Sequence, residues 1–306
     1  MDHDCPAPAS PALPRARPPL LLVAALLTVY LLWGSTYLAI RIALETVPPF
    51  ALGAVRFLIA GGGLYLVLRL RGAPAPSPRE WRTAAITGVL LFVGGNGFVV
   101  LGEQWVSSGL VALVVGTMPL WAAVFAGIGG QRSSAREWLG LALGFLGISV
   151  LSLGGELHAA GIGALLVVLA PVCWALGVVL GRRGPLPAGG MAAASQMLAA
   201  SVVLLGLSLG FGEPLLAVPS TRSLLAVAYL IVFGSLVGFT AYAYLLRNAR
   251  TAVANSYAYV NPIVAIVLGA ALAGEAVGPS TWLAAAIILS GLAVLARPRK
   301  PQDPTR

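Results

Sequence analysis

Ten apolar stretches, separated by short connections, constrain the fold of this chain more than any other feature. A helix needs about 20 mostly apolar residues to cross the hydrocarbon core of a bilayer. The 306 residues are 58% hydrophobic and 9% charged, whereas an ordinary soluble domain carries roughly 25% charged residues. We therefore predict an all-α integral membrane protein. Its ten transmembrane helices are expected over residues 20–40, 50–70, 83–101, 108–128, 137–153, 161–180, 189–210, 223–246, 253–273 and 281–296.

The basic residues indicate the orientation of these helices, because cytoplasmic loops of membrane proteins carry an excess of Arg and Lys. With the N-terminus inside, sixteen of the nineteen Lys and Arg residues fall in cytoplasmic segments. Arg41 and Arg222 fall outside, and Arg56 lies within the second span. Both termini are therefore expected in the cytoplasm. The formal net charge of +9 then reflects membrane orientation, and we expect no nucleic-acid partner.

The two ends of the chain differ in composition from the apolar stretches. Residues 1–19 are rich in Pro and Ala and predict a disordered cytoplasmic tail. Residues 297–306 are expected to form a basic cytoplasmic tail. Cys5 lies in the first tail and Cys173 in an apolar stretch, so they are not expected to pair, and Cys173 is interpreted as a packing residue. The run that starts at residue 20 is too long for the core of a cleaved signal peptide.

An internal repeat relates the two halves of the sequence. "SSGLVALVVGTMPLWAAVFAG" from residue 107 aligns without a gap with "RTAVANSYAYVNPIVAIVLGA" from residue 250, an offset of 143. Three further matches occur in the same order at offsets of 141, 140 and 144. They are Trp33 with Trp174, "AVRFLIA" from residue 54 with "ASQMLAA" from residue 194, and Trp138 with Trp282.

This repeat predicts an inverted arrangement. Five helices per half is an odd number, so the second half enters the membrane from the opposite side. We predict two inverted five-helix repeats over residues 20–153 and 161–296, an arrangement characteristic of secondary transporters. The alternative is a chance alignment of apolar helices.

Two segments, "LLWGSTYLAIRIALETVPPFALGAVRFLIAGG" and "SYAYVNPIVAIVLGAALAGEAVGPSTWLAAAIILSGLAVL", resemble signatures of the EamA-domain branch of the drug/metabolite transporter superfamily. The resemblance covers residues 20–296. It implies a ten-helix transporter of the bacterial cytoplasmic (inner) membrane with a central cavity between its halves, often exporting amino acids, metabolites or drugs. One departure is Gln131, which stands where the second half has Glu275. A symmetric role for Glu275 is therefore not expected.

Pro119 and Pro262 align in the two repeats, and each falls near the middle of a predicted span, the fourth and the ninth. A proline lacks the backbone N–H and displaces the carbonyl four residues earlier from the helix ladder. A polar backbone group freed in this way is tolerated where it lines a cavity. These prolines therefore either break the helices beside a binding site or serve as kinks that shape the bundle.

Polar and aromatic side chains within the spans are candidate ligands for a transported solute. An amide inside a membrane must face water or find a partner, and Asn255 and Tyr259 share one helical face. Hydrogen bonds between helices and an interfacial belt of aromatic rings are the structural alternatives. The candidates are Trp33, Tyr37, Asn96, Trp174, Asn255, Tyr259 and Asn261.

Arg56 and Gln196 complete the candidate site and occupy equivalent repeat positions. At 1.5 Å rise per residue, each lies roughly 10 Å below the surface from which its span starts. Arg56 either extends back to the outer interface, toward Glu45, or holds a substrate carboxylate with its planar guanidinium. Both residues are predicted to contribute to substrate binding.

Residues required by several other function classes are missing from the spans. No G-x-x-x-x-G-K-[ST] motif occurs and Lys300 is the only lysine, so ATP hydrolysis is not expected. Histidine occurs only at positions 3 and 158, and no Asp lies between residues 5 and 302. These absences argue against an intramembrane aspartyl protease, a His-ligated metal oxidase and a Ser-His hydrolase. We expect no enzymatic activity, no cofactor and no bound metal.

The predicted function is secondary transport by alternating access through the central cavity, with a small-molecule substrate and the lipid bilayer as partners. Facilitated export is the first hypothesis for the energy source. Proton-coupled export is the second. A proton antiporter usually needs an ionisable group that both sides can reach, whereas Glu45, Glu103 and Glu275 all lie near outer helix ends, so their placement does not support coupling. The alternative function is that of a non-transporting membrane scaffold or receptor, which gives no reason for an inverted repeat.

Overall fold

The computed structural model describes residues 19–128, 135–153, 161–214, 218–249, 251–254 and 256–296. These residues form helices joined by short connections, and no strand occurs among them. The segments predicted as tails lie outside the described residues, except for Pro19. The helices are α1 (Pro19–Ala43), α2 (Pro49–Leu70), α3 (Pro78–Gly88), η1 (Val89–Gly97), α4 (Phe98–Gly102), α5 (Ser108–Val115), α6 (Met118–Ile128), α7 (Ala135–Leu153), α8 (Ile162–Arg183), α9 (Gly190–Gly210), α10 (Thr221–Tyr229), η3 (Leu230–Val237), α11 (Gly238–Asn248), α12 (Thr251–Ala254), α13 (Tyr257–Ala273) and α14 (Pro279–Ala296).

Seven helical stretches within the described ranges are long and apolar enough to cross a membrane. They are Leu20–Ala43, Pro49–Leu70, Pro78–Gly102, Ser108–Phe125, Ile162–Arg183, Gly190–Gly210 and Thr221–Leu245. Three shorter apolar stretches cover Trp138–Val150, Val260–Ala273 and Pro279–Gly291. The predicted all-helical membrane class is confirmed.

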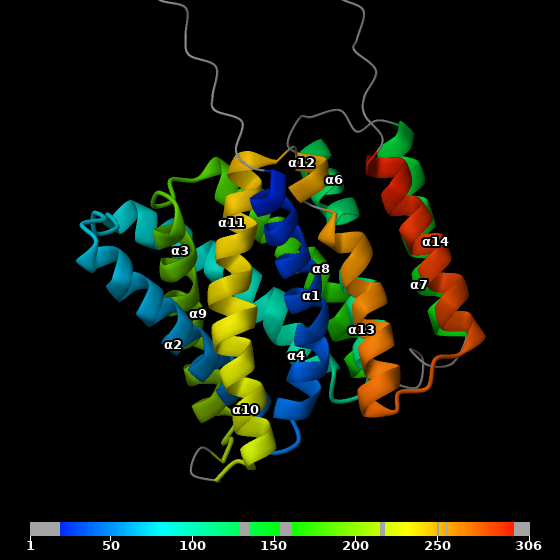
Figure 1. The fold of residues 1–306 in the computed structure, drawn as a ribbon, viewed down its shortest axis with the longest axis horizontal. Coiled ribbons are helices and arrows are strands. Elements are labelled where there is room, and N and C mark those ends of the chain that lie inside the picture. Colours follow the sequence, from blue (N-terminus) through cyan, green and yellow to red (C-terminus); the bar gives the residue numbers. More distant parts are fainter. Residues whose placement is uncertain are drawn as a thin grey trace, which may run out of the picture.

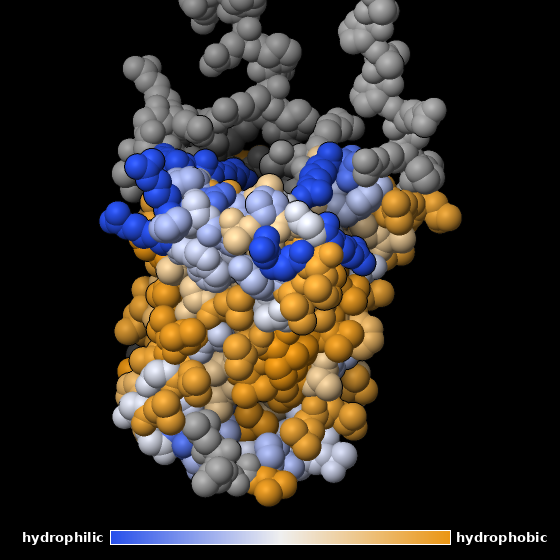
Figure 2. Space-filling model, turned by 90° about the vertical axis from the view of Figure 1, so that its left-hand side faces the viewer, coloured by the Kyte–Doolittle hydropathy of each residue, from blue (hydrophilic) through white to orange (hydrophobic). Residues whose placement is uncertain are grey.

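The surface of the bundle changes from apolar to polar toward one end. On the face shown in Figure 2, a hydrophobic band crosses the middle and a hydrophilic cap lies at the upper end. In Figure 1 the same end holds the start of α1 and the ends of α11 and α14. Exposed arginines lie in the last turns of α2, α8 and α11, at Arg69, Arg182 and Arg247. This surface fits a chain whose middle contacts lipid and whose ends contact water.

Local capping signals set where several helices begin and end. Ser77 and Glu80 form a reciprocal capping box, so α3 begins at Pro78, earlier than the predicted residue 83. Ser220 accepts a hydrogen bond from the backbone of Ser223 at the start of α10. Gly274 ends α13 with a left-handed backbone (φ 65°), a conformation that glycine adopts without strain.

Small residues allow pairs of helices to approach closely, as is typical of membrane proteins. A Cβ atom added to Gly61 of α2 would lie 2.7 Å from the Cβ of Met197 in α9. One added to Gly140 of α7 would lie 3.0 Å from the carbonyl oxygen of Gly291 in α14. The α7–α14 pair lies at one edge of the bundle (Figure 1), so the remaining helices surround its centre.

Two long helices contain a wide π-helical segment in their middle. These are η1, between α3 and α4, and η3, between α10 and α11. They start 141 residues apart, which is the offset that aligns Trp33 with Trp174. Such segments interrupt the regular hydrogen-bond ladder and are frequent at functional sites. Both supply residues to the cavity described below.

The span predicted over residues 108–128 is divided into α5 and α6 by a turn at Gly116 and Thr117. Pro119 therefore lies in the first turn of α6 and not in mid-helix, which corrects the expectation from sequence. The reason is that the N–H groups in the first turn of a helix have no acceptor within the helix, so a proline there removes no helical hydrogen bond. Pro262, by contrast, lies inside α13, as predicted.

Candidate functional site: a central cavity lined by a buried arginine

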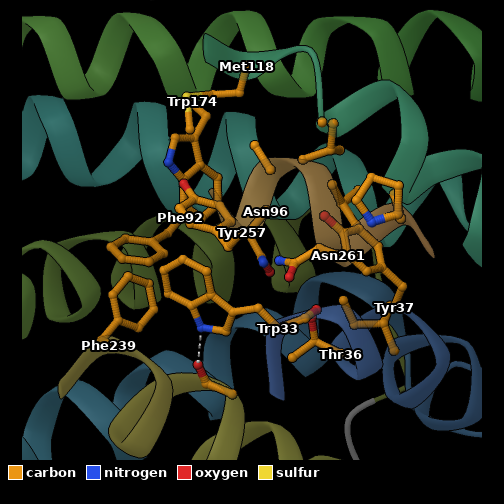
Figure 3. Close-up of a pocket in the computed structure, with 18 of the residues that line it drawn as sticks. Trp33, Thr36, Tyr37, Phe92, Asn96, Met118, Trp174, Phe239, Tyr257 and Asn261 are labelled. Atoms are coloured by element: carbon orange, nitrogen blue, oxygen red, sulfur yellow. Dashed lines mark hydrogen bonds between the residues drawn. The ribbon is translucent and has the colours of Figure 1, made fainter. Parts of the chain in front are cut away.

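A central cavity lies among helices from both halves of the chain. Figure 3 shows its side chains converging from several elements. The first half contributes Trp33, Thr36, Tyr37 and Ile40 from α1, Arg56 and Phe57 from α2, Phe92 and Asn96 from η1, Val99 from α4, and Ala112, Val115, Gly116 and Met118 around the α5–α6 break. The second half contributes Trp174, Gly234, Phe239, Tyr257, Ala258, Asn261 and Pro262.

Trp33 forms much of one wall of the cavity. Its indole N–H donates to the carbonyl of Gly234 in η3 at 3.1 Å (Figure 3). Its ring lies about edge-on to Phe239 and Tyr257, with centroids 5.3 and 5.0 Å apart. Such aromatic contacts add specificity to apolar burial. The predicted aromatic residue at position 33 is therefore an anchored part of the cavity.

Each of the two aligned tryptophans packs on a glycine of the other half. A Cβ atom added to Gly238 would lie 2.4 Å from Nε1 of Trp33. One added to Gly95 would lie 2.8 Å from Cε3 of Trp174. Because these glycines carry no side chain, the indoles can lie directly against α11 and η1, and both tryptophans reach the cavity.

Arg56 is a buried cation at the cavity wall, with 4% of its surface exposed. Its Nε donates to the hydroxyl of Ser235 at 2.9 Å, and its guanidinium donates to Oδ1 of Asn96 at 3.4 Å. The guanidinium carbon also lies 5.1 Å from the centre of the Phe57 ring. Among the described residues no acidic side chain pairs with Arg56.

The position of Arg56 decides between the two interpretations drawn from sequence. Glu45 pairs with Arg222, at 3.1 Å, at the exposed surface. Arg56 instead lines the cavity and contacts neutral partners. Its side chain therefore faces the interior and does not extend to the outer interface.

Two amides place further polar groups in the cavity. Asn96 and Asn261 both point into its central space in Figure 3. With its nitrogen turned toward them, the Asn261 amide donates to the carbonyls of Tyr30 (3.2 Å) and Tyr257 (3.3 Å). Asn96 accepts from Arg56. The amides thus combine hydrogen bonds between helices with exposure to the cavity, both of which the sequence predicted as alternatives.

The interrupted helices meet beside the cavity. A Cβ atom added to Gly116 would lie 3.2 Å from both the carbonyl oxygen of Ala258 and Cγ of Pro262. Ala258 is four residues before Pro262, so its carbonyl lacks the usual helical donor. Val115 is the last residue of α5, at the break before α6. Ala258 and Val115 both line the cavity. Both helix interruptions are therefore located at the cavity wall.

Gln196 lies outside the cavity, although its aligned position is that of Arg56. It is 8% exposed, and its amide donates to the hydroxyl of Thr87 at 2.8 Å. A Cβ atom added to Gly88 would lie 2.4 Å from the carbonyl oxygen of Gln196, so α3 and α9 are in backbone contact there. The structure places Gln196 in a helix–helix contact.

The remaining candidates are placed as follows. Tyr37 and Trp174 line the cavity, as does Asn261. Asn255 and the side chain of Tyr259 lie outside the described residues. Among described residues, no group of three or more His, Cys, Asp or Glu side chains could hold a metal ion.

Phe92, Phe239 and Ser235 were not predicted as site residues. Phe92 lies with its ring centroid 5.7 Å from that of Phe239, and Ser235 accepts from Arg56. An isolated Phe or Ser in an apolar span gives no signal of its own. Phe92 lies two residues before the "GG" pair of η1, and Ser235 belongs to the "GS" pair of η3, which is the feature that could have drawn attention to these two residues.

The model of the EamA-like transporter family matches residues 20–153 and again residues 161–297. The chain belongs to the EamA-like transporter family. This membership confirms the family resemblance seen in the sequence, and it makes the protein a membrane transporter. It is also consistent with the expectation that the protein is not an enzyme.

This EamA-like transporter has named relatives in several organisms. It is 46% identical over 276 residues to the "Uncharacterized inner membrane transporter YedA" of Escherichia coli (strain K12), covering 90% of each chain. It is 27% identical to the "Uncharacterized transporter YvbV" of Bacillus subtilis (strain 168), covering 95% of each. A solved crystal structure with 23% identity matches at a TM-score of 0.63, covering 90% of this chain and 98% of the other, and supports the fold alone.

Proposed function

We propose that this EamA-like transporter exports small metabolites, amino acids or drugs across the bacterial cytoplasmic membrane by alternating access through the central cavity. The main observation behind this proposal is that one amphipathic cavity is lined by side chains from both halves of the chain. The cavity wall also contains the buried Arg56, which has no acidic partner among the described residues. A non-transporting scaffold would have no need for such a cavity, and a receptor would use it to bind a ligand but gives no reason for an inverted repeat.

The proposal includes an inverted arrangement of two five-helix halves. The π-helical segments η1 and η3 recur at an offset of 141, and Trp33 and Trp174 each pack on a glycine of the opposite half. Related halves of opposite orientation can exchange conformations and so open one site to each side in turn. Both termini are proposed to be cytoplasmic, since exposed arginines gather at the corresponding helix ends.

The chemistry of the cavity suits a solute with an anionic group on an apolar body. A buried cation is costly unless it is paired, and a bound carboxylate would supply the partner that Arg56 lacks. The planar guanidinium can donate two parallel hydrogen bonds to a carboxylate. Trp33, Phe92 and Phe239 would contact the apolar part of the solute.

Flux measurements in proteoliposomes test this proposal. The probes are radiolabelled L-phenylalanine and L-leucine, with their amides as matched compounds that lack the carboxylate. We expect efflux of the amino acids above that of protein-free vesicles and little protein-dependent efflux of the amides. If a panel extended to other carboxylates shows no protein-dependent flux, transport is contradicted and the scaffold function is favoured. Equal efflux of acids and amides would contradict only the proposed binding role of Arg56, and the transport function would stand.

A further inference from the structure

Glu103 is a buried carboxyl group that the transport site does not use. It follows the last residue of α4, only 3% of its surface is exposed, and neither carboxyl oxygen has a hydrogen-bond partner among the described residues. A buried polar atom without a partner is uncommon in proteins and calls for a functional or chemical explanation.

Nearby Glu275 has the opposite environment. Its carboxylate accepts hydrogen bonds from the backbone N–H of Ser108 (3.0 Å) and Gly109 (3.3 Å) and from the Ser108 hydroxyl (3.0 Å), at the start of α5. It also lies 3.4 Å from Nε of Arg41 in α1. Through these contacts Glu275 fastens α1 and α5 to the connection after α13.

Glu103 lies one helical turn beyond the cavity. Its backbone N–H donates to the carbonyl of Val99 at 2.9 Å, and Val99 lines the cavity. Tyr37, another lining residue, lies close enough to the Glu103 carboxyl to interact with it electrostatically. Arg41 follows Tyr37 by one turn of α1. The carboxyl group thus lies between the cavity and the Arg41–Glu275 contact.

Among the described residues, three charged or titratable groups act on Glu103. They are Arg41 and Tyr37 from α1 and Glu275 from the connection after α13. On the α8 side, Val167 and Gly163 pack on the adjacent Gly102 and carry no charge. Glu156 and His158 lie outside the described residues, so variants of both belong in the test below.

An ionised carboxylate in this place would be expensive. It would have no hydrogen bond, and Glu275 would repel it. Burial first, and then the charge of Glu275, raise the pKa of the Glu103 carboxyl well above its usual range, while Arg41 opposes this shift. A neutral carboxylic acid avoids the burial of a charge and the repulsion by Glu275, and it retains only the smaller cost of its unpaired polar atoms.

We propose that Glu103 is a proton-binding site at the outer end of the cavity and that it couples export of the solute to entry of a proton. When the carboxyl releases its proton to water, the O–H bond breaks and a second negative charge remains beside Glu275. Both carboxylates then compete for Arg41, which loosens the contact between α1 and the connection after α13. The coupling rests on the proposed function, whereas the proton site does not.

The first experiment tests the proton site without a substrate. Infrared difference spectra of the full-length chain in lipid are recorded between acidic and alkaline pH. We expect a protonated-carboxyl C=O band in the wild type that is lost in Glu103→Gln and retained in Glu45→Gln, whose glutamate forms an exposed surface pair. The Glu156→Gln and His158→Gln variants should also retain it. An unchanged spectrum in Glu103→Gln would overturn the proposal.

Thermal stability in detergent gives a second, independent measurement. Since the pKa of Glu103 is raised in the native state, the native state binds more protons than the unfolded chain, so stability should fall as pH rises through that pKa. Glu103→Gln should melt near the wild-type temperature at acidic pH and lose this part of the pH dependence. A variant with the full wild-type pH dependence would contradict the assignment.

The second arm tests coupling with L-phenylalanine as the probe in proteoliposomes. A gradient of about one pH unit, acidic opposite the solute, should drive up to about tenfold accumulation for one-for-one exchange. Glu103→Gln should keep counterflow between equal solute pools and lose the response to the gradient. If the wild type transports phenylalanine and the pH gradient has no effect on its accumulation, the proposed proton coupling is contradicted and the transport function stands. If phenylalanine is not transported at all, the infrared result still decides the proton site.

Discussion

Arg56 and Gln196 stand at aligned positions in the two halves of the chain, yet their environments differ. Arg56 of α2 lines the cavity and donates to Ser235 and Asn96. Gln196 of α9 donates to Thr87 and lies where α3 and α9 touch. Each therefore contacts the opposite half, but only Arg56 reaches the space between them. The difference shows that a repeated framework can hold a single, one-sided binding group.

The two tryptophans show the opposite behaviour, because their contacts are retained in both halves. Trp33 packs on Gly238 and Trp174 packs on Gly95, and both line the cavity. Close packing against a glycine is a matter of shape, which related halves can share. Each buried charge costs free energy. This cost gives a physical reason why only one of the two aligned positions holds an arginine.

The strongest test of this asymmetry is Gln196→Arg. An arginine there would bury a cation against the backbone of α3 with no acidic partner in reach among the described side chains, which we expect to destabilise the protein by about 3–5 kcal/mol. Thermal melting and the yield of monodisperse protein in detergent measure the effect. If the Gln196→Arg variant is as stable as the wild type, position 196 is hydrated, and the proposed difference between the environments of positions 56 and 196 is contradicted.

The shared tryptophan contacts are tested by Gly238→Ala and Gly95→Ala. The added Cβ atoms would lie 2.4 Å from Trp33 and 2.8 Å from Trp174, and overpacking of this kind costs about 1–3 kcal/mol. The matched control is Gly63→Ala, where nothing lies within 4 Å and a small stabilisation is expected. Melting temperatures should fall in both variants and not in the control. A loss in only one half would show that the contacts are not equivalent.

The binding role of Arg56 is tested by Arg56→Gln, which places the residue of the second half into the first. Loss of charge-assisted hydrogen bonds should weaken carboxylate transport by about 10- to 100-fold. Arg56→Lys should recover part of it, since lysine keeps the charge without the planar fork. Initial rates against solute concentration give the change. Unaltered rates for the carboxylate would assign Arg56 a structural role.

The smallest effect is expected for Gln196→Met, which removes the hydrogen bond to Thr87 and keeps the side-chain volume. The loss should be about 1 kcal/mol of stability, with no change in the solute concentration that gives half-maximal transport. Melting temperature and initial rates separate these quantities. A large change in apparent affinity would place Gln196 in the transport site.

Much of the cavity could be predicted from residue type alone. Trp33, Tyr37, Arg56, Asn96, Trp174 and Asn261 are polar or aromatic residues at membrane depth, and all of them line it. Gln196 satisfied the same criterion and lies elsewhere. The reason is that these spans are apolar on every side, so no amphipathic stripe reveals which face of a helix is turned inward. Phe92 and Phe239 could not be distinguished from lipid-facing residues for the same reason.

The sequence by itself determined that this protein is a bundle of membrane helices, because long apolar segments can satisfy their backbone hydrogen bonds in lipid only by forming helices. It also determined the family. The tertiary structure decided which side chains share the cavity, where α5 gives way to α6, and that Glu103 is buried beside a partnered Glu275. These features depend on the rotation and contact of helices far apart in the chain, which short-range sequence patterns do not encode.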